Sequence, residues 1–300
     1  MNKNIIGQSE LQVSEIALGC MSIGTEEQTA VRIIHEALDR GVNLLDTADL
    51  YDAGRNEELV GRAIQGRRDQ VVLATKVGNR RVPGQEGWVW DASKAYILSA
   101  VKDSLKRLGT DYIDLYQLHG GTLEDNIDET IEAFEQLQRE GVIRYYGISS
   151  IRPNVIREYA ARSNIVSVMS QYSLFDRRPE EEVLPLLEAK GISAIVRGAV
   201  AGGALTEEGE AKLAKGYLGR DEAELRELRA RLKKAADRPL NETALKYVLA
   251  SPAVAAVAAG ASSVEQLRAN VAQAAGSPLT PEELAAVRAA VPANKYTQHR

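Results

Sequence analysis

Short runs of apolar residues alternate with longer amphipathic segments along the whole chain. Most of the apolar runs are rich in Val, Ile and Leu and lack polar alternation, which is typical of strands buried on both faces. The last run is rich in Ala, and its place in the series is the main reason to assign it as a strand. The predicted strands are residues 16–18, 42–45, 71–74, 112–118, 142–148, 165–169, 192–196 and 254–259.

Segments with helical spacing of apolar residues lie between these runs. Several of them end at a glycine, as at Gly41, Gly109, Gly141 and Gly191. A glycine at this position is typical of a left-handed helix C-cap. The predicted helices are residues 26–40, 94–108, 128–140, 180–190, 241–249, 263–274 and 281–290.

Eight strand–helix units follow one another without a linker rich in Pro or Ser. This pattern predicts an α/β fold, a single (β/α)8 TIM barrel that takes up residues 1–300 as one domain. A doubly wound parallel sheet is the competing architecture. It usually carries a Gly-x-Gly-x-x-Gly fingerprint after its first strand, and the sequence has no such fingerprint.

Charge and cysteine content limit the classes of protein to which the chain can belong. The formal net charge of −5 is spread along the chain, which argues against binding to nucleic acid or to an anionic membrane. The single Cys20 cannot form an intrachain disulfide, in keeping with a reducing compartment. Residues 1–18 lack the apolar run of a signal peptide, and no later run could cross a bilayer. We expect a soluble cytoplasmic protein.

Polar residues close three consecutive predicted strands, at the end of the barrel where such folds carry their active sites. Asp46 closes the second strand, and Tyr51 follows five residues later, whereas Lys76 and His119 close the third and fourth strands. Each residue alone has an ordinary structural explanation as a cap, a solvated charge or a packed ring. Together they predict a catalytic site. No metal is expected, because His119 has no Cys or His at ligand spacing.

These four side chains meet the needs of carbonyl reduction. Addition of hydride to a carbonyl requires an acid that protonates the developing alkoxide, and a free phenol with a pKa of ~10 is a poor donor. A neighbouring ammonium lowers the pKa of a phenol, so Lys76 would activate Tyr51. Asp46 would keep Lys76 charged, and His119 would orient the substrate oxygen.

Three motifs carry a resemblance to a known family. Leu45-Asp46-Thr47-Ala48-x-x-Tyr51, followed by Glu57 and Gly61, resembles the Asp–Tyr signature of the aldo-keto reductase superfamily. Thr75-Lys76 is similar to its lysine motif, and Asp114-x-x-x-x-His119 is similar to its histidine motif. The order of the motifs matches over essentially the whole chain.

The resemblance is strongest to bacterial members related to the potassium-channel β-subunit branch, which often carry a step like Arg197-Gly198. It implies reversible reduction of aldehydes and ketones to alcohols with NAD(P)H. Hydride would come from the nicotinamide, and Tyr51 would act as the general acid. The expected partner is a small carbonyl compound, and neither nucleic acid nor a membrane is expected.

The resemblance also implies a cofactor site. Ser149, Ser150 and Gln171 match positions that contact the nicotinamide carboxamide, and Arg197 stands where many relatives stack a Tyr on the ring, which a guanidinium can also do. Residues 198–205 resemble the pyrophosphate loop, with a plain connecting loop as the alternative. The implied cofactor-binding residues are Gly19, Ser149, Ser150, Gln171, Arg197, Gly198, Val200, Gly203, Gly260, Ser262, Gln266 and Asn270.

The adenosine end of this site departs from the family pattern. Gly260-Ala261-Ser262-Ser263-x-x-Gln266-x-x-x-Asn270 is similar to the adenosine-phosphate motif but lacks the usual Lys or Arg for the 2′-phosphate. Arg268 is near in sequence, but helical spacing puts it on a different face from Asn270. The two serines can still bond a phosphate at a helix N-terminus. NADP(H) is the expected cofactor, with NAD(H) as the alternative.

Residues around the substrate are harder to assign. Trp88 and Trp90 lie in the predicted loop 78–90, where they either overhang the site or pack within the loop. Met21 lies where relatives line the pocket, whereas Cys20 has no neighbouring base that would make it a nucleophile. The predicted substrate-binding residues are Met21, Tyr51, Trp88 and His119.

Two other functions fit parts of the sequence. The channel-branch resemblance allows a regulatory subunit that binds nucleotide and has only vestigial turnover. A barrel lyase or isomerase could use Lys76 as a Schiff base. The sequence identifies neither the physiological carbonyl nor the oligomeric state.

Overall fold

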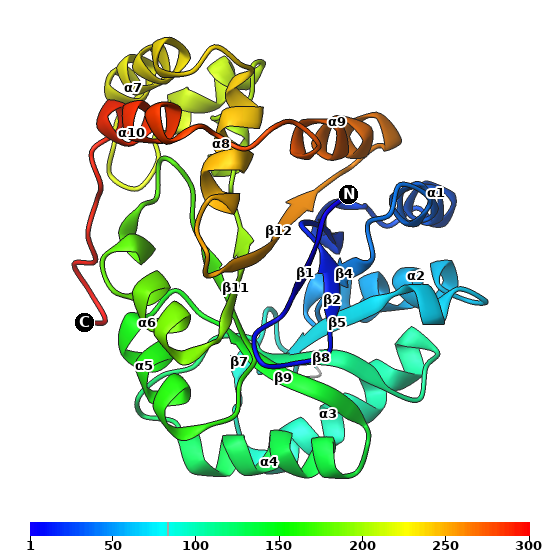
Figure 1. Ribbon diagram of the computed structural model, residues 1–300. Helices are drawn as coiled ribbons and strands as arrows, with labels where there is room; N and C mark the ends of the chain where they lie inside the picture. Colours follow the sequence, from blue (N-terminus) through cyan, green and yellow to red (C-terminus); the bar gives the residue numbers. More distant parts are fainter. Residues whose placement is uncertain (83) are drawn as a thin grey trace.

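Eight parallel strands close into a barrel in the computed structural model of the protein, which describes residues 1–82 and 84–300 (Figure 1). Each strand pairs with the next in chain order, and the last pairs with the first. The predicted fold is confirmed, including the Ala-rich last strand. The barrel strands are β3 (Ile16–Gly19), β4 (Leu44–Asp46), β5 (Val72–Val77), β8 (Ile113–Leu118), β9 (Ile143–Ser149), β10 (Ser167–Gln171), β11 (Ser193–Arg197) and β12 (Val254–Gly260).

Helices surround the barrel (Figure 1). Three of them, α2, α5 and α7, were not predicted from the sequence. The α-helices are α1 (Glu27–Asp39), α2 (Arg55–Ala63), α3 (Lys94–Leu108), α4 (Ile127–Arg139), α5 (Pro153–Arg162), α6 (Val183–Lys190), α7 (Glu222–Ala235), α8 (Leu240–Leu249), α9 (Val264–Ala274) and α10 (Pro281–Ala290). Among the described residues, no helix is long and apolar enough to cross a membrane.

Two short hairpins and several single turns complete the fold. The hairpin of β1 (Lys3–Ile5) and β2 (Gln12–Ser14) brings Ile6, Leu11 and Val13 into one cluster with the side chains inside the barrel, so it plugs the N-terminal end of the strands. The hairpin of β6 (Asn79–Arg80) and β7 (Val89–Trp90) follows β5. The 3-10 turns are η1 (Cys20–Ser22), η2 (Tyr51–Gly54), η3 (Arg68–Gln70), η4 (Arg178–Glu180), η5 (Ala201–Gly203) and η6 (Gly209–Lys215).

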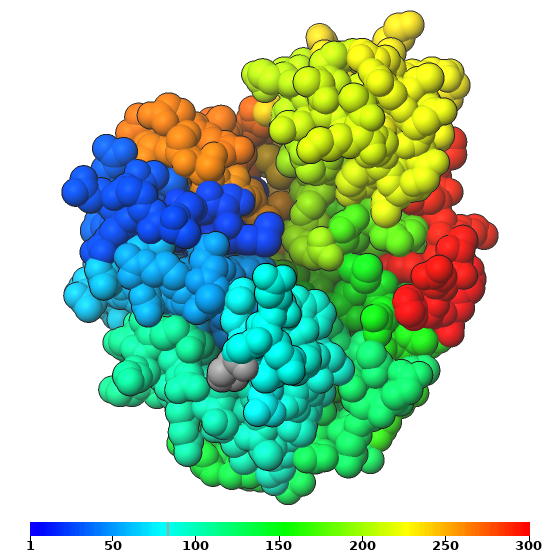
Figure 2. Space-filling view, turned by 180° about the vertical axis from the view of Figure 1, so that it is seen from behind, coloured from blue at the N-terminus to red at the C-terminus, as the bar shows by residue number. Residues whose placement is uncertain are grey.

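The apolar core has two parts. A large cluster fills the space between the strands and the helices, and a smaller one fills the barrel interior. The opposite, C-terminal end of the strands is open, and the space-filling view shows the molecule hollowed there between the segments coloured blue to orange and those coloured green to yellow (Figure 2). This end therefore offers the place for a ligand site.

Candidate active site

A cavity of about 1180 Å³ lies at the C-terminal ends of the barrel strands. Most of the residues predicted for catalysis, cofactor binding and substrate binding line it, whereas Ser262 lies outside its lining and Lys76 is buried behind it. The predicted residues that line the cavity are Gly19, Met21, Asp46, Tyr51, Trp88, His119, Ser149, Ser150, Gln171, Arg197, Gly198, Val200, Gly203, Gly260, Gln266 and Asn270.

Lys76 connects Asp46 to Tyr51. Its ammonium group donates to Asp46 Oδ2 at 2.7 Å, to the carbonyl oxygen of Thr47 at 2.7 Å and to the hydroxyl of Tyr51 at 3.4 Å. Lys76 is 0% exposed, so these bonds use all of its donors without help from bulk solvent. Burial has the largest single effect and lowers the pKa of Lys76, but the charges and hydrogen bonds of Asp46 and Tyr51 together outweigh it, so the pKa is raised. Lys76 therefore carries its positive charge beside the phenol.

The pKa of Tyr51 differs from the sequence expectation. Lys76 lowers it as expected, but burial of the phenol has the larger effect, so the pKa lies above its usual value. The hydroxyl of Tyr51 thus keeps its proton at neutral pH in the cavity. A protonated phenol held against an ammonium group can give up its proton when a base develops beside it, because Lys76 then stabilises the phenolate.

His119 lies on the other side of Tyr51. The two rings are 6.0 Å apart between centroids and stand edge to face at 86°. The backbone N–H of His119 donates to Val77 at 2.7 Å, while its buried Nδ1 has no hydrogen-bond partner among the described residues. Burial, together with Lys76 and Arg197, lowers the pKa of His119 to about 3. The imidazole is therefore neutral and can donate one hydrogen bond to an oxygen in the cavity.

The neutral state of His119 predicts a specific loss of stability in acid. Because the folded pKa of about 3 lies below the unfolded value of 6.5, the unfolded chain binds more protons between these values, and stability falls as pH falls. From pH 7 to pH 5, this group should lower the free energy of unfolding by about 2 kcal/mol. Urea denaturation of the wild type and of His119→Asn measures the difference, and equal pH dependence of the two would contradict the assignment.

Two buried polar residues at the start of α2 connect the ends of neighbouring strands. The hydroxyl of Thr47 donates to Asn56 Oδ1 at 2.7 Å, and the amide of Asn56 donates to the carbonyl oxygen of Cys20 at 2.9 Å. The hydroxyl of Thr75 donates to Glu57 Oε1 at 2.6 Å. Since Thr47 and Thr75 are the neighbours of Asp46 and Lys76 in the chain, these bonds hold the strand ends that carry the ion pair.

Arg107 of α3 completes this arrangement. Its Nε donates to Glu57 Oε2 at 2.7 Å, and its side chain lies against Gly54, where a Cβ atom would come within 2.8 Å of it. Gly54 and the two residues before it, Asp52 and Ala53, all have positive φ angles. The turn directly after Tyr51 is therefore strained, and the glycine leaves room for the arginine that covers it. The sequence signal here was Glu57; nothing in the pattern singled out Arg107.

Loss of the charge on Glu57 should destabilise the fold. In Glu57→Gln, Arg107 would face a neutral amide in place of a buried carboxylate, and we expect the free energy of unfolding to fall by about 1–3 kcal/mol. Glu58→Gln is the matched control, because the Glu58 side chain is 44% exposed and such surface pairs contribute about 1 kcal/mol or less. Urea denaturation compares the two, and similar effects would contradict the structural role of Glu57.

Hydrogen bonds organise the far side of the cavity. Arg197 donates to Gln171 Oε1 at 2.9 Å, and Gln171 Nε2 donates to Asp176 and to the hydroxyl of Tyr217, each at 3.0 Å. The turn η5 that follows, at residues 201–203, has positive φ angles at all three positions. Tyr217 and Asp176 were missed in the sequence, since neither lies at a strand end.

The residues of the predicted adenosine-phosphate motif form the start of α9. Ser263 caps the helix by accepting from the backbone N–H of Gln266, and Asn270 donates to the carbonyl oxygen of Gly260 at 3.0 Å. Arg268 points away to α1, where it forms an ion pair with Glu36 at 2.8 Å. The expectation that Arg268 occupies a different face from Asn270 is therefore correct. The backbone N–H and the hydroxyl of Ser262 both donate to Gln266 Oε1, at 2.8 and 3.1 Å.

The two tryptophans of the β6–β7 hairpin differ in their surroundings. Trp88 is 52% exposed at the cavity. Trp90 also lines the cavity, but its indole N–H donates to Asp125 at 2.8 Å and its ring covers Gly78 and Gly120.

Cys20 is completely buried, and burial raises the pKa of its thiol, which agrees with its exclusion as a nucleophile.

Comparison with known proteins gives one family. Residues 15–292 match the model of the aldo/keto reductase family. The chain is 58% identical to the uncharacterized oxidoreductase YqkF of Bacillus subtilis (strain 168), over the whole of both chains. It superimposes on the holo form of the aldo-keto reductase AKR11C1 from Bacillus halodurans with a TM-score of 0.95 and 59% identity, covering 100% of this chain and 99% of that one. An aldo/keto reductase from Klebsiella pneumoniae in complex with NADP and acetate superimposes with a TM-score of 0.80 and 27% identity, covering 100% and 99%.

Proposed function

This chain belongs to the aldo/keto reductase family, and from that membership we propose that it reduces aldehydes and ketones with NADPH, using Tyr51 as the acid. The observation that carries the proposal is the bond from the buried Lys76 ammonium to the Tyr51 hydroxyl at 3.4 Å. It couples the phenolic proton of Tyr51 at the cavity to the positive charge of Lys76. The carbonyl oxygen of a substrate would lie between Tyr51 and His119.

The residues divide the work as follows. Nicotinamide, when bound, supplies a hydride to the carbonyl carbon. Tyr51 gives its proton to the carbonyl oxygen as negative charge develops there, and Lys76 stabilises the phenolate that this leaves. Asp46 keeps Lys76 charged at 2.7 Å. His119, neutral because burial lowers its pKa to about 3, donates a hydrogen bond to the oxygen without competing for the proton.

The donors in the cavity suit a nicotinamide dinucleotide. The hydroxyl groups of Ser149 and Ser150 line the cavity and suit a carboxamide, and Gln171 would join them by exchanging its bonds to Asp176 and Tyr217. Backbone N–H groups of residues 198–203, with positive φ angles at Gly202 and Gly203, offer a concave surface for a pyrophosphate. We assign the residues named from the sequence, Ser262 included, to this cofactor.

We expect NADPH to bind more tightly than NADH, since Ser262 and the N-terminus of α9 favour a phosphate. Arg268 cannot help while Glu36 holds it, so we expect the preference to be moderate. In Ser262→Asp, the added negative charge should raise the Kd for NADPH about tenfold and change that for NADH little. Fluorescence titration measures both constants, and equal changes in the two would place the 2′-phosphate elsewhere.

Steady-state turnover tests the function as a whole. The purified chain, given NADPH and a panel of simple aldehydes, should consume the cofactor without any added partner. The alternative of a regulatory subunit predicts tight nucleotide binding with negligible turnover in the same assay. The Schiff-base alternative requires a free amine, whereas all donors of Lys76 are engaged by oxygen atoms. Borohydride should therefore trap no adduct at Lys76.

A further inference from the structure

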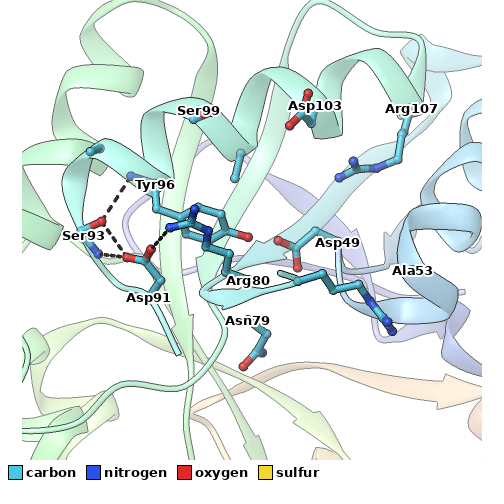
Figure 3. A pocket seen from close by; sticks show the side chains of 13 residues that line it. Asp49, Ala53, Asn79, Arg80, Asp91, Ser93, Tyr96, Ser99, Asp103 and Arg107 are labelled. Carbon is cyan, nitrogen blue, oxygen red and sulfur yellow. Dashed lines mark hydrogen bonds and ion pairs between the residues drawn. The ribbon is translucent and has the colours of Figure 1, made fainter. Parts of the chain in front are cut away.

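A second cavity, of about 520 Å³, lies between the turn after Tyr51, the β6–β7 hairpin and α3 (Figure 3). Of its described lining residues, only Asn79 also lines the large cavity. The mechanism proposed above uses none of its side chains. It is therefore a separate compartment, on the other side of the turn that carries Tyr51.

Asp49 brings a carboxylate with one unpartnered oxygen into this second cavity. Its Oδ1 is buried and has no hydrogen-bond partner within residues 1–82 and 84–300, although the backbone N–H of Leu50 donates to the carboxylate. Burial, with Glu57 next in effect, raises the pKa of Asp49 to about 7. A buried carboxylate oxygen without a donor is costly, and such atoms in folded proteins normally have a partner.

Tyr96 faces Asp49 across this space. Figure 3 shows the Tyr96 hydroxyl and the Asp49 carboxylate pointing toward each other, and no hydrogen bond joins the two described side chains. Two oxygen atoms arranged in this way can both accept hydrogen bonds from one group placed between them, if that group has several donors. A primary ammonium group has three donors and no acceptor, so it matches such a pair.

The arginines around the cavity are largely engaged elsewhere. Arg107 is bound to Glu57 at 2.7 Å. Arg80 is bound to Asp91 at 3.1 Å and lies over the ring of Tyr96 at 5.7 Å. The remaining charged side chains, Arg81 and Asp103, are both exposed, so they set opposite charges at the rim. Asp49 supplies the carboxylate at the inner end of the cavity, where the charge of Arg107 also acts on it.

We propose that this cavity binds the primary ammonium group of a small organic molecule between Asp49 and Tyr96. The ligand is either a simple amine or an amino acid. The exposed Arg81 and Asp103 at the rim offer a positive and a negative charge to the polar group at the other end of either kind of molecule. The bound ammonium supplies a positive charge next to Asp49 and the hydrogen-bond donor that Asp49 Oδ1 lacks.

Binding should depend on pH through Asp49. The titratable and charged groups that face it are Glu57 on α2, Tyr96 and Arg107 on α3, Lys76 on β5 and Tyr116 on β8. With the pKa of Asp49 at about 7, the ionised form that attracts an ammonium group is depleted below neutral pH. Affinity should therefore fall about tenfold from pH 8 to pH 6.

Calorimetric titration of the full chain at pH 8 tests the site with four molecules that share a four-carbon chain. Putrescine and γ-aminobutyrate carry an ammonium group, whereas succinate and 1,4-butanediol do not. We expect saturable binding of at least one of the first two and of neither of the others. Their relative affinities identify the ligand as an amine or an amino acid.

Matched variants locate the binding. Asp49→Asn, which removes a buried charge and should not unfold the chain, is expected to weaken amine binding about tenfold or more. Tyr96→Phe should weaken it to a smaller extent, and Asp237→Asn, at an exposed position, should leave it unchanged. The proposal is overturned by binding of succinate alone, by amine binding that Asp49→Asn does not alter, or by no saturable amine binding. Because the readout is binding and not turnover, these outcomes are independent of the proposed reductase activity.

Discussion

Tyr51→Phe should lower kcat for aldehyde reduction by about a thousandfold, because the variant retains the ring but has no proton to give. The Kd for NADPH should stay within about twofold, since the lost hydroxyl bonds Lys76 at 3.4 Å and the ring still fills its place at the cavity. Single-turnover kinetics and a fluorescence titration measure the two quantities.

Tyr112→Phe is the control for this experiment, because Tyr112 precedes β8 at the opposite end of the barrel and should behave as wild type. Turnover by Tyr51→Phe close to that of the control would remove Tyr51 from the mechanism. A parallel loss of NADPH binding would instead point to damage of the cavity.

Lys76→Met should have two large effects with different causes. Turnover should fall by about a hundredfold or more, because the phenolate of Tyr51 loses its stabilising charge. The free energy of unfolding should also fall by about 3–5 kcal/mol, because Asp46, 4% exposed, is left as an unpaired buried carboxylate. Steady-state kinetics and urea denaturation separate the two.

The double variant Lys76→Met, Asp46→Asn distinguishes catalysis from folding. It removes both charges of the pair, so most of the lost stability should return, since replacing a buried ion pair by neutral groups costs far less than breaking it. Turnover should remain low. If activity returned together with stability, Lys76 would have a structural role only, and the account of Tyr51 as a coupled acid would be wrong.

The barrel was predictable because each strand is a local feature. A strand buried on both faces needs a continuous apolar run, and such a run is visible without knowing what covers it. Helices α2 and α7 were not predicted, because they lack such a clear local pattern. The α2 segment buries Asn56 and Glu57, and α7 is mostly charged, so neither shows the broad apolar face that the periodic pattern requires.

The grouping of Asp46, Lys76 and His119 was predictable for a related reason: parallel strands bring their C-terminal ends to one rim, so residues far apart in sequence become neighbours there. The pKa of Tyr51 was not predictable. The direction of its shift depends on how much water the cavity admits. Burial raises the pKa by more than Lys76 lowers it.

By itself, the sequence determined the order of the eight strands and which polar side chains close them, because both follow from the pattern of neighbouring residues. Tertiary structure decided what surrounds each of those side chains. It placed Arg107 over the turn after Tyr51, bound Arg268 to Glu36 and left Oδ1 of Asp49 without a donor among the described residues. These outcomes depend on contacts between separate elements, and on the burial that such contacts create, which no local pattern of residues encodes.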